Sequence, residues 1–228
     1  IIAPVQISRN DNDSFVKVAA SEQSLAGVNE YPRIVNGSSP LPADYAPENL
    51  MSLATLPGGE DILLRTDAAE AFLTMCAAMS EDGLGIIPVR GYVSFDEQSS
   101  ALTDAANRLI AEGTDAQEAQ ELARKEVFAP GEDEAQLGTS IDVSTDPNSV
   151  ANFSYTEQYL WICRNAHRYG FIIRYNDAAK AVTGVSVKPW HLRYVGVEAA
   201  GYIFSANCSL EQYVAAVKAD NPGAKEAD

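Results

Sequence analysis

Two short apolar runs carry side chains suited to metal-dependent hydrolysis. The first, residues 188–196, reads KPWHLRYVG and contains His191, one of two histidines in the chain. The second, residues 138–143, reads GTSIDV and contains one carboxylate, that of Asp142. Imidazole nitrogens and carboxylate oxygens are typical ligands of catalytic zinc, which also keeps a position open for water. We therefore interpret the two runs as walls of a metal-hydrolase cleft.

The hydrophobic pattern predicts the elements that must position these runs. Helical spacing occurs in six segments: 67–79, a stretch that begins after Ser94, 114–128, 156–169, 197–205 and 209–219. Thr114 and Gln117 stand at the spacing of a capping box. Strands are predicted at 86–89 and 171–175, each shortly after a glycine that ends a helix. Helices lead and short strands follow without regular alternation, which predicts an α+β fold.

Length and charge set the domain organisation and exclude some partners. A chain of 228 residues can bury a full core as one domain. We expect this domain at residues 31–220, after an N-terminal arm or linker (1–30) and before a C-terminal tail (221–228). The net charge of −16 disfavours binding to nucleic acid or to anionic lipid. No apolar run approaches the roughly 18 residues of a membrane helix, so no transmembrane segment is predicted.

Three stretches resemble the zinc D-alanyl-D-alanine carboxypeptidases of the VanY type. They are residues 91–98 (GYVSFDEQ), 138–142 (GTSID) and 189–196 (PWHLRYVG). The resemblance extends in order over roughly residues 31–215. It implies a single α+β domain with a small, mainly antiparallel sheet flanked by helices. It also implies peptidoglycan stem peptides as partners and an extracytoplasmic location, in the cell envelope or secreted. The chain begins with Ile1 rather than Met, and we expect a signal peptide or anchor to precede it.

The sequence departs from this family at three functional positions. The family binds zinc through a histidine, an aspartate seven residues later and a distal histidine. Asp142 and His191 match the last two, but Ala135 stands where the first histidine is expected. Lys188 replaces the glutamate that serves as general base, and Val93 replaces the arginine that pairs with the terminal carboxylate of the substrate.

These replacements predict a catalytically inactive homologue. A methyl group binds no metal, an ammonium group accepts no proton, and an isopropyl group pairs with no carboxylate. We expect no cofactor, with Asp142 and His191 as a vestigial metal site, and a binding or scaffold role at the cell wall. The retained residues expected to line the binding cleft are Tyr92, Ser94, Gln98, Trp190 and Tyr194.

Two other functions stay open. One is an active metallo-D,D-carboxypeptidase whose rearranged zinc site takes a carboxylate from residues 132–134, where the family has Ser-x-His and this chain has Asp133-Glu134-Ala135. The other is a structural module whose cleft is closed.

Other side chains near the predicted cleft carry further predictions, some with two interpretations. Lys188 is predicted to place its ammonium group near Asp142, where the zinc charge is missing. Arg90 either replaces the lost substrate anchor or forms a surface salt bridge. Trp190 either stacks on a ligand or packs in the core. Ser94 and Gln98 either face the cleft or cap and support the helix that follows.

Overall fold

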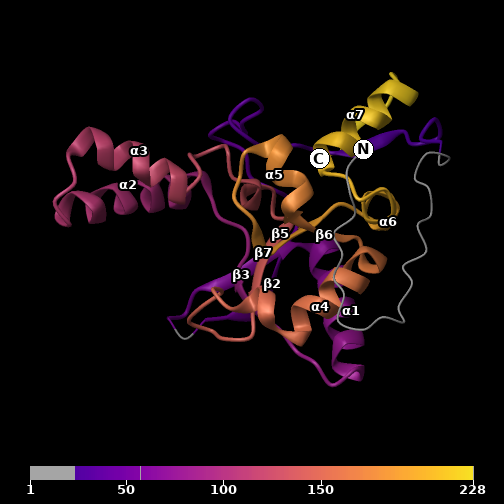
Figure 1. Ribbon diagram of the computed structural model, residues 1–228, viewed down its shortest axis with the longest axis horizontal. Coiled ribbons are helices and arrows are strands. Elements are labelled where there is room, and N and C mark those ends of the chain that lie inside the picture. Colours follow the sequence, from indigo (N-terminus) through magenta and orange to yellow (C-terminus); the bar gives the residue numbers. More distant parts are fainter. Residues whose placement is uncertain (1–23, 57, 228) are drawn as a thin grey trace. The chain divides into compact units, whose positions relative to one another are not determined.

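The computed structural model describes residues 24–56 and 58–227 (Figure 1). The chain divides into two compact units. Residues 34–73 and 87–143 form one, called the Asp142 unit below. The described residues 24–33, 74–86 and 144–227 form the other, the His191 unit. Of the predicted N-terminal arm, residues 1–23 lie outside the described residues.

The Asp142 unit contains a hairpin, a second pair of strands and a pair of helices. The elements are β2 (Leu50–Thr55), β3 (Asp61–Arg65), β4 (Ile87–Arg90), α2 (Phe95–Ala111), α3 (Ala116–Glu126), the 3-10 helix η2 (Glu134–Leu137) and β5 (Ser140–Ser144), with residues 66–73 of α1 (Thr66–Glu81). Strand β2 pairs antiparallel with β3, and β4 neighbours β5. Helices α2 and α3 lie side by side (Figure 1) and pack through small side chains, because Ala105, Ala119 and Ala123 are buried.

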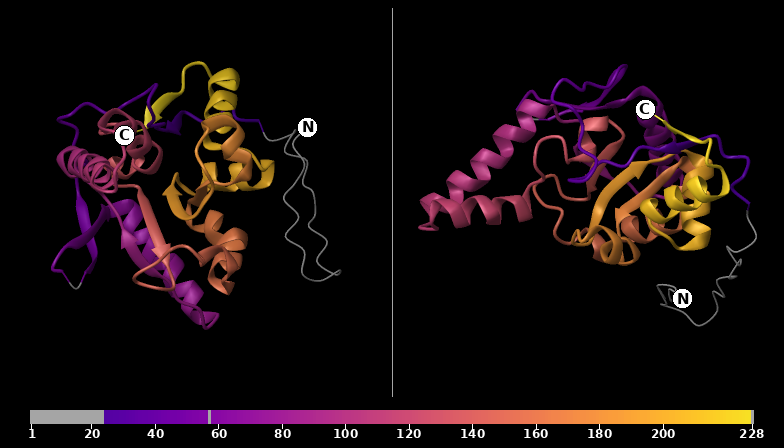
Figure 2. Two further views of the ribbon diagram at one scale, coloured as in Figure 1. Left: turned by 60° about the vertical axis from the view of Figure 1, so that its left-hand side comes forward. Right: turned by 90° about the horizontal axis from the view of Figure 1, so that it is seen from above.

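The His191 unit pairs two sets of strands and packs short helices around them. Its elements are β1 (Glu30–Pro32), η3 (Phe153–Tyr155), α4 (Glu157–Asn165), η4 (Ala166–Tyr169), β6 (Phe171–Tyr175), α5 (Asp177–Thr183), β7 (Lys188–Tyr194), α6 (Val197–Ala206), α7 (Leu210–Asp220) and β8 (Lys225–Ala227). Strand β6 pairs antiparallel with β7, and β1 pairs parallel with β8. Helix α6 packs on α7, both yellow in Figure 2. No helix among the described residues is long and apolar enough to cross a membrane.

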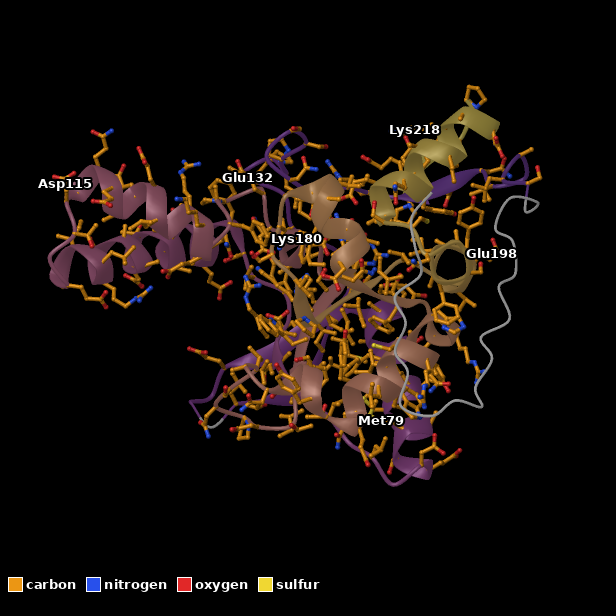
Figure 3. All side chains as sticks on the ribbon, viewed as in Figure 1. Met79, Asp115, Glu132, Lys180, Glu198 and Lys218 are labelled. Atoms are coloured by element: carbon orange, nitrogen blue, oxygen red, sulfur yellow. The ribbon has the colours of Figure 1, made fainter. Side chains whose placement is uncertain are left out.

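The predicted α+β fold is confirmed, since the described residues combine helices with small antiparallel strand pairs. One predicted detail is wrong, and one helix is confirmed with a 3-10 last turn. Helix α3 is capped by Asp115 (labelled in Figure 3), not by Thr114, because the Asp115 carboxylate accepts the backbone N–H of Gln117 at 2.9 Å. The helix predicted over 156–169 is α-helical only as far as Asn165, and η4 completes it. Strand β8 lies within the segment predicted as a tail.

Gly91, directly after β4, is expected to tolerate no side chain. A Cβ atom there would lie 2.3 Å from the carbonyl oxygen of Leu63, which also accepts the N–H of Tyr92 at 2.7 Å. Leu63 belongs to the β2–β3 pairing, so a shift of its backbone would disrupt that strand pairing. We expect Gly91→Ala to lower the free energy of unfolding by about 2 to 4 kcal/mol in urea titrations. The control is exposed Gly85→Ala, where a Cβ meets nothing within 4 Å; an equal loss there would contradict the steric explanation.

Candidate functional site

Asp142 lies in the middle of β5. Because successive side chains of a strand point to opposite faces, the burial of its neighbours shows on which face its carboxylate lies. Ile141 and Val143 are fully buried on one face, while Asp142 is half-buried on the other. Strand β4 neighbours β5 and ends at Arg90. The carboxylate of the predicted metal site therefore belongs to a rigid strand next to a strand that ends in a guanidinium group.

The segment that would carry the missing zinc ligand is built around η2. The carboxylate of Asp133 caps this turn by accepting the N–H of Ala135 at 2.9 Å. Gly138 ends it in the left-handed region (φ 70°), a conformation that glycine adopts without strain. The Gly138 carbonyl then accepts the N–H of Arg65 at 2.7 Å. Position 135 is thus firmly placed and buried, but its side chain is a methyl group.

Arg90 is anchored by two side chains of the same unit. Its Nη2 donates to the Asp133 carboxylate at 2.7 Å and to Gln98 Oε1 at 3.0 Å. Gln98 is buried and donates from Nε2 to the Phe128 carbonyl at 2.7 Å. The Arg90 side chain is 35% exposed and that of Asp133 only 2%, so the salt bridge predicted at the surface has a buried carboxylate end.

The pKa of the Arg90 guanidinium reflects these neighbours. Burial by itself lowers this pKa, since it disfavours the charged form. The charge of Asp133, its hydrogen bond and the charge of Asp142 act in the other direction, and the net pKa is raised. Arg90 is therefore a permanent cation under the influence of both carboxylates.

The loop after β4 holds three positions of the predicted cleft. Ser94 forms a capping box with Glu97: its hydroxyl accepts the Glu97 N–H at 3.2 Å, and the Glu97 carboxylate accepts the Ser94 N–H at 2.7 Å. The hydroxyl also donates to that carboxylate at 2.7 Å. Ser94 thus begins α2, as one of its two interpretations predicts. Tyr92 and Val93 are half-buried, and burial, followed by the charges of Glu97 and Tyr45, raises the pKa of Tyr92.

The His191 unit presents the other predicted residues on β7. His191 is 4% exposed and stacks on the Tyr175 ring of β6, with 5.3 Å between ring centroids. The ammonium nitrogen of Lys188 lies 5.7 Å from the centroid of the same ring. Trp190 is half-buried, and the ring of Tyr194 packs on Phe171 at 5.3 Å. The predicted approach of Lys188 to Asp142 concerns residues of different units and stays a prediction.

The donor set does not fit the zinc ion that the resemblance implies. The three expected ligand positions hold a methyl group, a carboxylate and an imidazole, which is one donor fewer than a catalytic zinc site uses. Among residues 24–56 and 58–227, no group of three or more His, Cys, Asp or Glu side chains is placed to hold a metal ion.

The acidic side chains that a rearranged site would recruit already have neighbours in the Asp142 unit. Asp133 binds Arg90 and the N–H of Ala135. Glu134 is fully buried and accepts the Ser140 hydroxyl at 3.3 Å. The Glu132 carboxylate (labelled in Figure 3) lies over Gly37, where an added Cβ would be 3.4 Å away. In chemical terms, the Asp142 unit offers charged and hydrogen-bonding groups that already interact with one another.

Sequence reasoning named Arg90 and Gln98 separately but missed that they form one network with Asp133. The departure of Asp133 from the family's serine was the available signal, because a carboxylate introduced at a buried position needs a cationic or N–H partner.

Comparison with known proteins gives consistent matches. The family described as VanY, D-alanyl-D-alanine carboxypeptidase, matches residues 61–197. The D-alanyl-D-alanine carboxypeptidase of Enterococcus faecalis is 35% identical over 182 residues, which cover 79% of this chain and 64% of the relative. This chain therefore spans less than two thirds of that relative's length.

Solved structures match with similar coverage. VanYB in complex with D-alanine-D-alanine is 33% identical with a TM-score of 0.66, covering 80% of this chain and 96% of VanYB. A variant of the vancomycin-resistance D,D-pentapeptidase VanY in complex with Zn(II) is 32% identical with a TM-score of 0.65, covering 80% of this chain and 97% of that one.

Proposed function

The chain belongs to the VanY family of D-alanyl-D-alanine carboxypeptidases, and from this premise we propose that it is a catalytically inactive member that binds peptidoglycan stem peptides. The observation that carries the proposal is the buried methyl group of Ala135. It occupies a well-ordered turn, at the position where the resemblance expects a zinc ligand. We infer that the replacement of histidine by alanine removes a ligand while the surrounding turn stays folded.

The expected loss of rate is large. General-base catalysis contributes about 10²- to 10⁴-fold, and an ammonium group at Lys188 has no lone pair with which to supply it. Loss of the metal removes, in addition, the activation of water and the stabilisation of negative charge on the scissile carbonyl. The two losses act on the same step, which supports an inactive protein rather than a slow enzyme.

Binding is supported by what the chain retains. Tyr92, Trp190 and Tyr194 are half-buried and keep part of their aromatic surface available for a ligand. VanYB, which this chain resembles over 80% of its length, was solved with D-alanine-D-alanine. We propose that this chain recognises the same stem-peptide terminus at the cell wall, in an extracytoplasmic location.

The test combines metal content, turnover and binding in one sample. The chain is incubated with Zn²⁺ and a stem pentapeptide, and zinc per chain, released D-alanine and bound peptide are measured. We expect substoichiometric zinc, no D-alanine above the protein-free blank and saturable peptide binding by calorimetry. The matched variants Trp190→Ala and Trp161→Ala separate the predicted cleft from another half-buried tryptophan of the same unit, and only Trp190→Ala is expected to weaken binding.

Other outcomes contradict the proposal in distinct ways. One zinc per chain together with release of D-alanine indicates an active carboxypeptidase with a rearranged site. Neither zinc, turnover nor peptide binding at millimolar concentration indicates a structural module.

A further inference from the structure

The Asp142 unit contains a cation of its own beside the predicted metal site. Arg90 ends β4, and Asp142 occupies the neighbouring strand β5. The guanidinium donates hydrogen bonds to Asp133 at 2.7 Å and to Gln98 at 3.0 Å. Asp133 stands two residues before Ala135, where the resemblance expects serine. The residue that anchors Arg90 is therefore itself a departure from the family, in the segment that also lost its ligand.

The carboxylates in this part of the unit require a compensating positive charge. Asp133 is 2% exposed, Glu134 is fully buried and Asp142 is half-buried. Buried carboxylates are stable only when a cation or several N–H groups compensate them. In a metal-binding relative, a dication would compensate the carboxylate at the position of Asp142. Here a guanidinium group is available, and it remains charged at any physiological pH.

We propose that Arg90 takes the electrostatic place of the metal ion, fixed by Asp133 and Gln98 next to Asp142, and thereby excludes divalent metal from this unit. The inference rests on the proposed absence of a zinc site but goes further, because it states that restoring the missing ligand is not enough to restore metal binding. Strand β4 neighbours β5, and the charge of Asp142 acts on Arg90, so a dication bound at Asp142 would be repelled by this guanidinium group. Loss of the zinc site and gain of the Arg90–Asp133 pair are then two parts of one rearrangement.

The experiment measures zinc affinity in a background that supplies the missing groups. The background variant carries Ala135→His and Lys188→Glu. To it is added either Arg90→Gln or the matched control Arg108→Gln, which alters an exposed arginine on α2 that pairs with Glu126. Zinc binding is followed by calorimetry and by elemental analysis after gel filtration. We expect Arg90→Gln to raise zinc affinity by about tenfold or more and Arg108→Gln to leave it unchanged.

The results that would contradict the inference differ from those that would contradict the proposed function. If the background variant binds zinc equally well with and without Arg90, the inference is wrong, while the proposed function stands. If the unaltered chain binds zinc, the proposed function fails first. Circular dichroism checks folding. Should Arg90→Gln unfold the background variant, the double change Arg90→Gln with Asp133→Ser removes both ends of the salt bridge, and the same gain in affinity is expected from it.

Discussion

Zinc-dependent release of D-alanine from a stem pentapeptide should appear when four side chains are changed together. The changes are Ala135→His, Lys188→Glu, Val93→Arg and Arg90→Gln. The first supplies the third metal donor, the second a general base and the third a partner for the substrate's terminal carboxylate. The fourth removes the competing charge. We expect a rate at least about 10⁴-fold above that of the unaltered chain, because metal and base each contribute orders of magnitude.

The measurement is a coupled assay for free D-alanine, run with added zinc and again after chelation. A matched protein that carries the other three changes but keeps Ala135 should stay at the blank rate, because two donors do not hold a catalytic zinc. Activity in that control would mean that the ligand set has been wrongly assigned. A fully changed protein that binds zinc without turnover would place the remaining defect in substrate positioning.

The largest effect on stability is expected at Arg174, a buried arginine in β6. Its side chain is 1% exposed and pairs with Glu211 in the first turn of α7, whose side chain is 17% exposed. Nη1 donates to one carboxylate oxygen at 3.2 Å, and Nη2 donates to the other. Removing one partner leaves a largely desolvated charge, so Arg174→Met should lower the free energy of unfolding by about 3 to 5 kcal/mol.

Two variants show whether burial causes this loss. Arg108 forms a comparable bridge with Glu126, but both side chains are about half exposed, at 53% and 47%. Arg108→Met should therefore cost less than about 1 kcal/mol in denaturant titrations. The double change Arg174→Met with Glu211→Leu should recover most of the stability, because it removes both buried charges. Equal losses of unfolding free energy for Arg174→Met and Arg108→Met would show that burial does not increase the contribution of the salt bridge to stability.

The elements predicted correctly are those with strong local signals. Helix α1 follows from apolar side chains at helical spacing, and β6 follows from an apolar run directly after Gly170, whose φ of 81° ends the preceding turn. The β2–β3 hairpin was missed, although its turn region contains two adjacent glycines, Gly58 and Gly59. The parallel pair β1–β8 joins segments at opposite ends of the chain, and no local pattern predicts such a pairing.

For the candidate site, too, short motifs could be recognised in the sequence, whereas contacts between distant residues could not. Ala135, Lys188 and Val93 were identified as departures from the family because each stands at a fixed spacing inside a short motif, and their assignment to the site stays a prediction. The Arg90–Asp133 bridge was not found, because its partners are 43 positions apart and meet only when η2 folds beside β4. Gln98 was predicted as a cleft residue or as support for α2. The residue is 1% exposed and its amide is hydrogen-bonded to Arg90 and Phe128, so it supports the buried side of this network.

The parallel pairing of β1 with β8 determines how the His191 unit would respond to mechanical force. Glu30 pairs with Lys225 and Pro32 with Ala227, and the N–H of Lys225 donates to the Asn29 carbonyl at 2.8 Å. Tension applied ahead of β1 and beyond β8 would pull the two strands past each other along their length. All contacts of the pair would then resist in shear at the same time instead of opening one after another. Under such a load, the β1–β8 pair would hold the two ends of the folded unit together.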